Sequence, residues 1–205
     1  MLDAAGFTSS RFYVSEWGAQ SDVVASAKRN DRITCMASPL ATAKVAMAIY
    51  AHPRTAAAAF HPFMQNSRVS RTEKLAIPVW GDQSVFFMAD RKQFQTTPVS
   101  EALILFREFA SESTLVPGQS DVPAGAQVLS AVDKEGPKYF VVNSAAQGFR
   151  FPAAISKRRT LFAPSPESTS VKYGSFGDRS GDVEGIVPHD FRDAKIPPYS
   201  VNLLR

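Results

Sequence analysis

The sequence has 205 residues, of which 44% are hydrophobic and 20% charged, and its net charge is +4. These are globular values, and the length suits one core of ordinary size, which excludes disorder of the whole chain. The single cysteine, Cys35, excludes an internal disulfide framework, and no apolar run approaches the roughly 18 residues that a membrane-spanning helix needs.

The first 35 residues show no sustained hydrophobic period, which predicts an extended N-terminal arm with one short strand at 11–14. Parts of residues 1–36 have a composition typical of an organelle transit peptide. Four acidic residues balance four basic ones there, however, and such peptides are poor in acids. The location is left open between a reducing intracellular compartment, an organelle and a virion.

An α+β core is expected over 36–145. Ser38 and Pro39 form an N-cap and first-turn pair, which predicts a helix over 40–51 that ends at His52-Pro53. The alternation of apolar residues over 44–50 allows a strand as the alternative. A second short helix is predicted over 55–60.

Two hairpins are expected. The first pairs residues 75–80 with 84–89 across a Gly-Asp-Gln turn, and Pro78 places its first arm at a sheet edge. The second pairs 127–132 with 138–142, and Gly136 supplies the turn.

The strongest single element is the helix predicted over 97–112. Thr97 is its expected N-cap and Pro98 suits its first turn. Apolar residues recur at helical spacing from Val99 to Ala110, and Ile104 and Leu105 widen the apolar stripe. We expect burial of this helix on more than one side, in the core or against a partner.

Residues 146–205 are read as a basic, Pro/Gly-rich, extended C-terminal arm. The predicted fold is therefore α+β, a small mixed or antiparallel sheet with two or three helices between long irregular arms. Spaced hydrophobic residues along the second arm are typical of a segment that grips a neighbouring protein. The expected anchors on this arm are Phe176, Phe191 and Tyr199.

The segment 146–172 carries five basic side chains and one acidic one. Its centre is a run of three cations beside several phenylalanines, a mixture that binds an acidic protein surface or, in the alternative, the phosphates and bases of a nucleic acid. The partner-binding cations predicted here are Arg150, Lys157, Arg158 and Arg159.

Motifs for catalysis are scarce. No phosphate-binding loop, dinucleotide fingerprint or zinc-helix motif occurs, so no cofactor, metal or catalytic residue is predicted. A small hydrolase that uses His52 or His189 with Ser180 is kept as an alternative, although the glycine-serine segment around Ser180 lacks the tight turn of a serine-protease oxyanion hole.

Together these features favour a non-enzymatic structural or linker subunit. Its partners would be other protein subunits of a large assembly, such as an organellar or photosynthetic complex or a viral shell. Nucleic acid is the less favoured partner.

Overall fold

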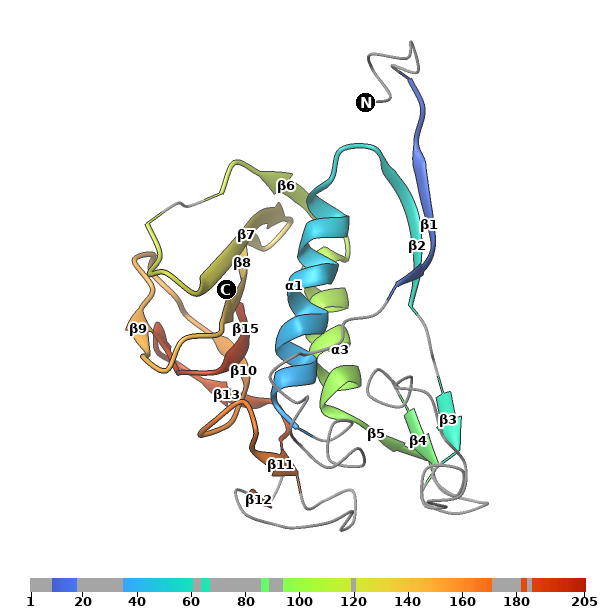
Figure 1. Cartoon of the computed structure of the whole chain (residues 1–205). Helices are drawn as coiled ribbons and strands as arrows, with labels where there is room; N and C mark the ends of the chain where they lie inside the picture. Colours follow the sequence, from blue (N-terminus) through green and yellow to red (C-terminus); the bar gives the residue numbers. More distant parts are fainter. Residues whose placement is uncertain are drawn as a thin grey trace.

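The computed structural model describes residues 9–17, 35–60, 64–66, 86–88, 94–118, 121–170, 182–183 and 186–205. Two helices combine there with mostly antiparallel sheets, which confirms the predicted mixed α+β class. The helices lie between a six-stranded sheet on one side and a pair of strands on the other (Figure 1). Within these residues, neither helix has the length and apolar character to cross a membrane.

The six-stranded sheet is antiparallel throughout, in the order β13-β10-β15-β8-β7-β6. Its strands are β6 (Thr114–Val116), β7 (Ala126–Asp133), β8 (Gly136–Asn143), β10 (Arg158–Phe162), β13 (His189–Phe191) and β15 (Ser200–Leu204). All five residues of β15 are buried, since β10 and β8 flank it.

The predicted second hairpin is confirmed as β7 and β8, which pair along their full length up to Asp133 and Gly136. Only Lys134 and Glu135 lie between the paired ends. Gly136 has a φ of 121°, a left-handed conformation that costs glycine little, and the Asp133 side chain accepts a hydrogen bond from the Glu135 N–H at 2.8 Å.

The stretch 146–205 contributes three strands of this sheet, β10, β13 and β15, where the sequence indicated an extended arm. The sequence pattern did not reveal these strands because their pairing partners are far apart in the chain. These strands have few residues each and no local hairpin partner, so their pairing depends on contacts with β8, far away in the chain. Periodicity within a short window does not report such contacts.

Helix α1 (Ala37–Ala51) confirms the helix predicted after Ser38 and excludes the alternative strand. Its start differs from the prediction, because Ser38 lies inside the helix and no side chain caps it. Instead the first N–H groups, of Met36 and Ala37, donate to the carbonyls of Ser168 and Pro166 at 3.1 and 2.8 Å. A tertiary contact thus satisfies donors that a capping side chain would otherwise satisfy.

Helix α3 (Pro98–Ala110) confirms the predicted helix and its cap. The Thr97 hydroxyl accepts a hydrogen bond from the Ser100 N–H at 3.3 Å. One side of α3 packs on the sheet and the other on α1, which explains the wide apolar stripe. Phe109 is fully buried, with its ring centroid 5.7 Å from that of Phe140 in β8.

Two small sheets lie beside the helices. β1 (Phe12–Trp17) overlaps the strand predicted over 11–14 and pairs in parallel with β2 (Thr55–Phe60). The predicted helix over 55–60 is therefore wrong. Its alanines favour a helix, but the backbone pairing with β1 overrides that weak local preference.

The second small sheet joins β3 (Met64–Asn66), β4 (Phe86–Met88) and β5 (Phe94–Thr96). β4 falls within the second arm of the first predicted hairpin. The first arm, 75–80, lies outside the described residues. A further parallel pair consists of β11 (Thr169–Ser170) and β12 (Asp182–Val183).

The core has two parts, one on each face of the six-stranded sheet. The larger part lies between the sheet and the helices and includes Leu105, Phe109, Phe140, Leu161 and Val201. The smaller part covers the opposite face and includes Val141, Phe151, Ile196 and Leu204. Because both faces are covered, the central strands are apolar in consecutive positions.

Candidate functional site

The smaller core is closed by a two-stranded antiparallel ribbon, β9 (Phe149–Arg150) and β14 (Lys195–Ile196). Phe149 and Ile196 are opposite each other and pack into this core. Gly148, just before β9, allows a close approach, since a Cβ atom there would lie 2.7 Å from the Ile196 carbonyl oxygen. The next register pair, Arg150 and Lys195, is exposed.

Arg158, the first residue of β10, is only 2% exposed, and each of its three guanidinium nitrogens donates a hydrogen bond. Its Nη2 lies 2.7 Å from the Asp193 carboxylate and its Nε donates to the Asp193 carbonyl at 3.3 Å. Its Nη1 donates to the Thr160 hydroxyl, which in turn donates to the Asn202 side chain at 2.8 Å. A buried charge requires such pairing, and this network fixes the guanidinium in one position.

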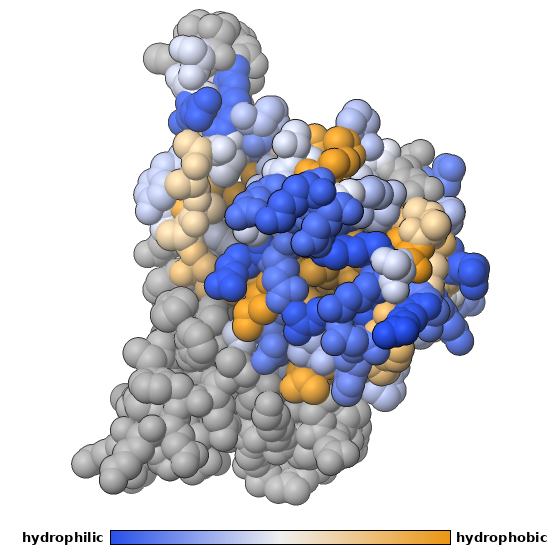
Figure 2. All heavy atoms as spheres, turned by 180° about the vertical axis from the view of Figure 1, so that it is seen from behind, coloured by the Kyte–Doolittle hydropathy of each residue, from blue (hydrophilic) through white to orange (hydrophobic). Residues whose placement is uncertain are grey.

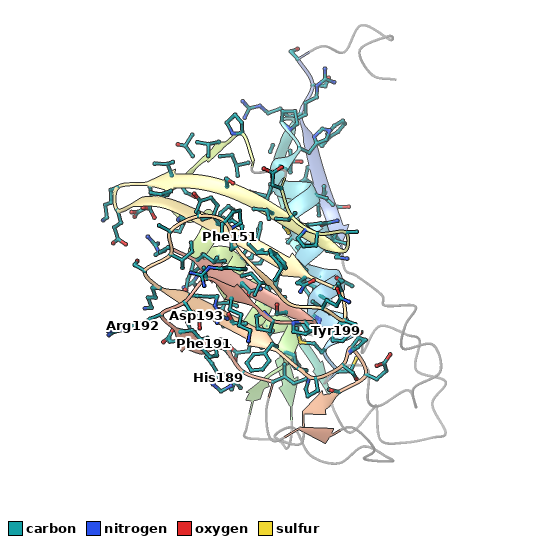
Figure 3. The ribbon with its side chains drawn as sticks, turned by 90° about the vertical axis from the view of Figure 1, so that its left-hand side faces the viewer. Phe151, His189, Phe191, Arg192, Asp193 and Tyr199 are labelled. Atoms are coloured by element: carbon teal, nitrogen blue, oxygen red, sulfur yellow. The ribbon has the colours of Figure 1, made fainter. Side chains whose placement is uncertain are left out.

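The Arg158 guanidinium also stacks on the ring of Phe191, 4.1 Å from its centroid. The two residues are directly opposite in the pairing of β10 with β13, so their side chains share a face of the sheet. Phe162 lies on the same face, with its ring centroid 6.3 Å from that of Phe191. Figure 3 shows Phe191 and Asp193 on this face, on β13 and the turn that follows it.

These side chains line a groove of about 680 Å³ at the edge of the sheet. Its walls come from β9, β10, β13, β14 and the segment after β14. The lining residues are Gly148, Phe149, Arg150, Arg158, Phe162, Phe191, Asp193, Lys195, Pro197 and Pro198. We refer to this feature as the aromatic groove.

Asp193 is the acidic residue among those that line the aromatic groove. The hydrogen bond from the Arg158 side chain, and then that from the Lys195 N–H, lower the pKa of Asp193 below its ordinary value, so this carboxylate is ionised at neutral pH. It balances Arg158. The charges of Arg150 and Lys195 have no salt bridge to another of the described residues.

The predicted partner-binding residues that the structure describes are distributed over four places. Arg150, Arg158 and Phe191 meet in the aromatic groove, and Lys157 lines a neighbouring hollow of about 530 Å³ that shares Phe191. Arg159 instead pairs with Glu108 of α3 at 2.6 Å. Tyr199 packs against the larger core, and Phe176 lies outside the described residues. Their binding to a partner stays a prediction.

The sequence did not identify Asp193 or Lys195 as site residues. They are some 35 residues from Arg158 in the chain, and no spacing motif connects them to it. The feature of the sequence that indicated a binding site here was the group of phenylalanines beside the run of three cations. Two of them, Phe149 and Phe162, do line the groove.

The serine-histidine alternative finds no assembled site in the described residues. His52 is exposed and its Nδ1 accepts a hydrogen bond from the Arg54 N–H at 3.2 Å. His189 is exposed on β13, with its ring centroid 5.9 Å from that of Phe162. Ser180 lies outside the described residues. In that same part of the chain, no group of three His, Cys, Asp or Glu side chains is placed to hold a metal ion.

Neither protein-family models nor curated proteins match this chain. Solved structures do. The chain resembles the GH51 arabinofuranosidase from Xanthomonas axonopodis pv. citri, with a TM-score of 0.58 and 13% identity over 95% of this chain and 40% of that one. It also resembles the catalytic domain of the GH30 xylanase C from Talaromyces cellulolyticus, with a TM-score of 0.54 and 13% identity over 96% and 41% of the two chains.

A third similar structure is the GH86 β-porphyranase from Bacteroides plebeius, with a TM-score of 0.51 and 13% identity over 95% of this chain and 34% of that one. This chain therefore shares its fold with part of each of these three glycoside hydrolases. It spans about two fifths of the length of the first of these proteins.

These likenesses contradict the prediction of a non-enzymatic structural or linker subunit. The similar proteins are hydrolases, and nothing in the comparisons supports a capsid or photosynthetic role. The prediction was wrong because it interpreted residues 146–205 as an extended arm that binds a neighbouring protein. Spaced hydrophobic residues occur equally in short strands of a sheet, as β10 and β15 show.

Proposed function

We propose that this chain is part of a carbohydrate-active protein of the glycoside hydrolase type and that its aromatic groove holds a saccharide. The observation that carries the proposal is the likeness of nearly the whole chain to glycoside hydrolases of three families. The chemistry of the groove supports it independently.

A saccharide presents apolar C–H faces and a rim of hydroxyl groups. The rings of Phe149, Phe162 and Phe191 offer apolar surface for the faces, while Asp193 offers carboxylate oxygens to the hydroxyls. The volume of about 680 Å³ is within the usual range of small-molecule sites. The Arg158 network keeps both Phe191 and Asp193 in place, so little ordering would be needed on binding.

Asp193 is suited to binding rather than to acid catalysis. Glycoside hydrolysis requires a carboxylic acid that stays protonated near neutral pH to protonate the leaving oxygen. The pKa values of Asp193 and Asp133 are both lowered, so we assign neither to that step. Hydrolysis by the whole protein is part of the proposal, and the groove is its saccharide-binding component.

The test is a binding screen of the purified chain against arabinan, xylan and porphyran oligosaccharides by calorimetry, with reducing-end release measured in parallel. We expect binding to at least one oligosaccharide. Phe191→Ala should weaken it by up to about tenfold, since stacked aromatic contacts contribute about 0.5 to 1.5 kcal/mol.

Tyr13→Ala is the matched control, because Tyr13 is an aromatic residue that is 66% exposed on β1 and lies outside the groove. It should leave binding unchanged. Because Phe191 also stacks on Arg158, thermal unfolding of Phe191→Ala must show a folded protein. A chain that binds and cleaves none of the oligosaccharides would overturn the proposal.

A further inference from the structure

The ribbon of β9 and β14, which lines the aromatic groove, contains a pair of like charges. Arg150 and Lys195 are directly opposite in the antiparallel pairing of β9 with β14. Directly opposite residues project from the same face of a ribbon, with Cβ atoms about 5 Å apart, and like charges at such positions repel each other. The other pair of the ribbon, Phe149 and Ile196, stabilises it by packing into the core.

No salt bridge within the described residues relieves this repulsion. The nearby carboxylate, Asp193, already pairs with Arg158 at 2.7 Å. Asp190, the next acid along the chain, lies 3.6 Å from the Nε of Arg159. The two ribbon cations are exposed, and both line the groove. The groove is therefore lined both by aromatic rings and by two positive charges that have no salt bridge within the described part of the chain.

We infer that the groove takes an acidic saccharide and that Arg150 and Lys195 bind the carboxylate of a uronic acid unit. This inference rests on the proposed saccharide-binding function and names its substrate class. A carboxylate between the two cations would replace their repulsion by two charge-assisted hydrogen-bonded contacts. The guanidinium of Arg150 has the planar fork that matches a carboxylate, and the ammonium of Lys195 adds a second charge.

The arrangement also orients the sugar. A uronic acid carries its carboxylate at the edge of the ring, so a carboxylate held at the ribbon leaves the ring faces available to the phenylalanines on β10 and β13. One ligand can thereby use both kinds of side chain at once. A neutral saccharide would use the aromatic rings and Asp193 but would leave the cation pair without an anion.

The experiment measures calorimetric affinities of the purified chain for a trigalacturonate, for a neutral xylotriose and for a sulfated carrageenan trisaccharide. We expect the trigalacturonate to bind most tightly, with an affinity that falls as salt rises from about 50 to 300 mM, because the screening length then shortens from about 14 to about 6 Å. The variant Arg150→Gln/Lys195→Gln should lose about tenfold or more of this affinity and most of its salt dependence.

Lys157→Gln is the matched control, because it removes a cation from the neighbouring hollow and not from the groove. It should change the affinity less than twofold. The double variant should also unfold at the same temperature as the parent chain or a higher one, since it removes a repulsive pair. A lower unfolding temperature would contradict the repulsion on which the inference depends.

The remaining outcomes separate the two proposals. Binding of xylotriose that depends on Phe191, with equal or weaker binding of trigalacturonate, would overturn the acidic-saccharide inference and leave the proposed function standing. Tighter binding of the sulfated sugar would overturn the assignment of a carboxylate. Binding of none of the three, together with failure of the wider oligosaccharide screen, would overturn the proposed function itself.

Discussion

Asp133 accepts hydrogen bonds from three groups at the turn between β7 and β8. Its Oδ1 accepts from the Glu135 N–H, and its Oδ2 lies 3.1 Å from the Lys138 ammonium and 3.0 Å from the Arg205 guanidinium. The Glu135 hydrogen bond is the largest influence that lowers the pKa of Asp133, to about 2. Lys138, which is fully buried, also donates to the last carbonyls of α3, those of Glu108 and Ser111. One carboxylate therefore supports both the hairpin and the end of the helix.

We predict that Asp133 contributes to the acid sensitivity of the fold. Its pKa is lower in the folded chain, about 2, than its ordinary value of 3.8. Its stabilising effect is thus complete above about pH 4 and is lost as the pH falls toward 2. Asp133→Asn should lower the free energy of unfolding at neutral pH and reduce the further loss between pH 4 and 2, as measured by urea unfolding.

Glu112→Gln is the control for this change, because the Glu112 side chain is 77% exposed and lies 3.9 Å from an equally exposed Lys134. It should leave the stability profile unaltered, as exposed ion pairs contribute little. If Asp133→Asn loses stability between pH 4 and 2 as steeply as the parent, the turn network does not stabilise the fold as described.

At the level of elements, the two helices begin in different ways. α3 has a side-chain cap from Thr97, whereas α1 depends on carbonyl groups of the segment 166–168. We predict that Thr97→Ala lowers the free energy of unfolding by about 1 kcal/mol, within the usual range of about 0.5 to 2 for a lost cap. Thr97→Ser, which keeps the hydroxyl, should retain most of the stability. Chemical denaturation of both variants measures the difference, and equal losses would show that the hydroxyl does not cap.

The elements that the sequence predicted correctly are those with local causes. The cap and period of α3, and the turn glycine between β7 and β8, act within a few residues. β2 was misread because its alanines favour a helix and only β1, far away in sequence, makes them a strand. The aromatic groove was predicted only in part for the same reason. Arg150, Arg158 and Phe191 were named, but the partners that complete the site, such as Asp193, join it through long-range pairing.

For the whole molecule, stability is distributed unevenly. The six-stranded sheet is covered on both faces, whereas β2 has three exposed and three half-buried residues and pairs with β1 alone among the described residues. Figure 2 shows apolar side chains along this strand pair at the molecular surface. A parallel pair exposed in this way is unusual, because parallel strands are normally buried on both faces.

We predict that the β1–β2 pair opens locally, well before the sheet does. In native-state hydrogen exchange, amides of β1 and β2 should exchange with opening free energies close to zero, while those of β8 and β15 should approach the global free energy of unfolding. Mass spectrometry of peptic fragments gives both values. Equal protection of the two regions would show that the pair is stabilised by contacts other than those described.

The position of β15 at the centre of the sheet has a consequence for synthesis. β8 and β10 are synthesised before residues 200–204. The last of these strands, β15, must therefore insert between the other two. Until then β8 and β10 each have an open backbone edge, and such edges pair with other chains. Chaperone dependence during translation should therefore end only when this last central strand has left the exit tunnel. Ribosome-bound chains stalled before residue 200 should bind a general chaperone, and chains extended by a linker beyond Leu204 should release it.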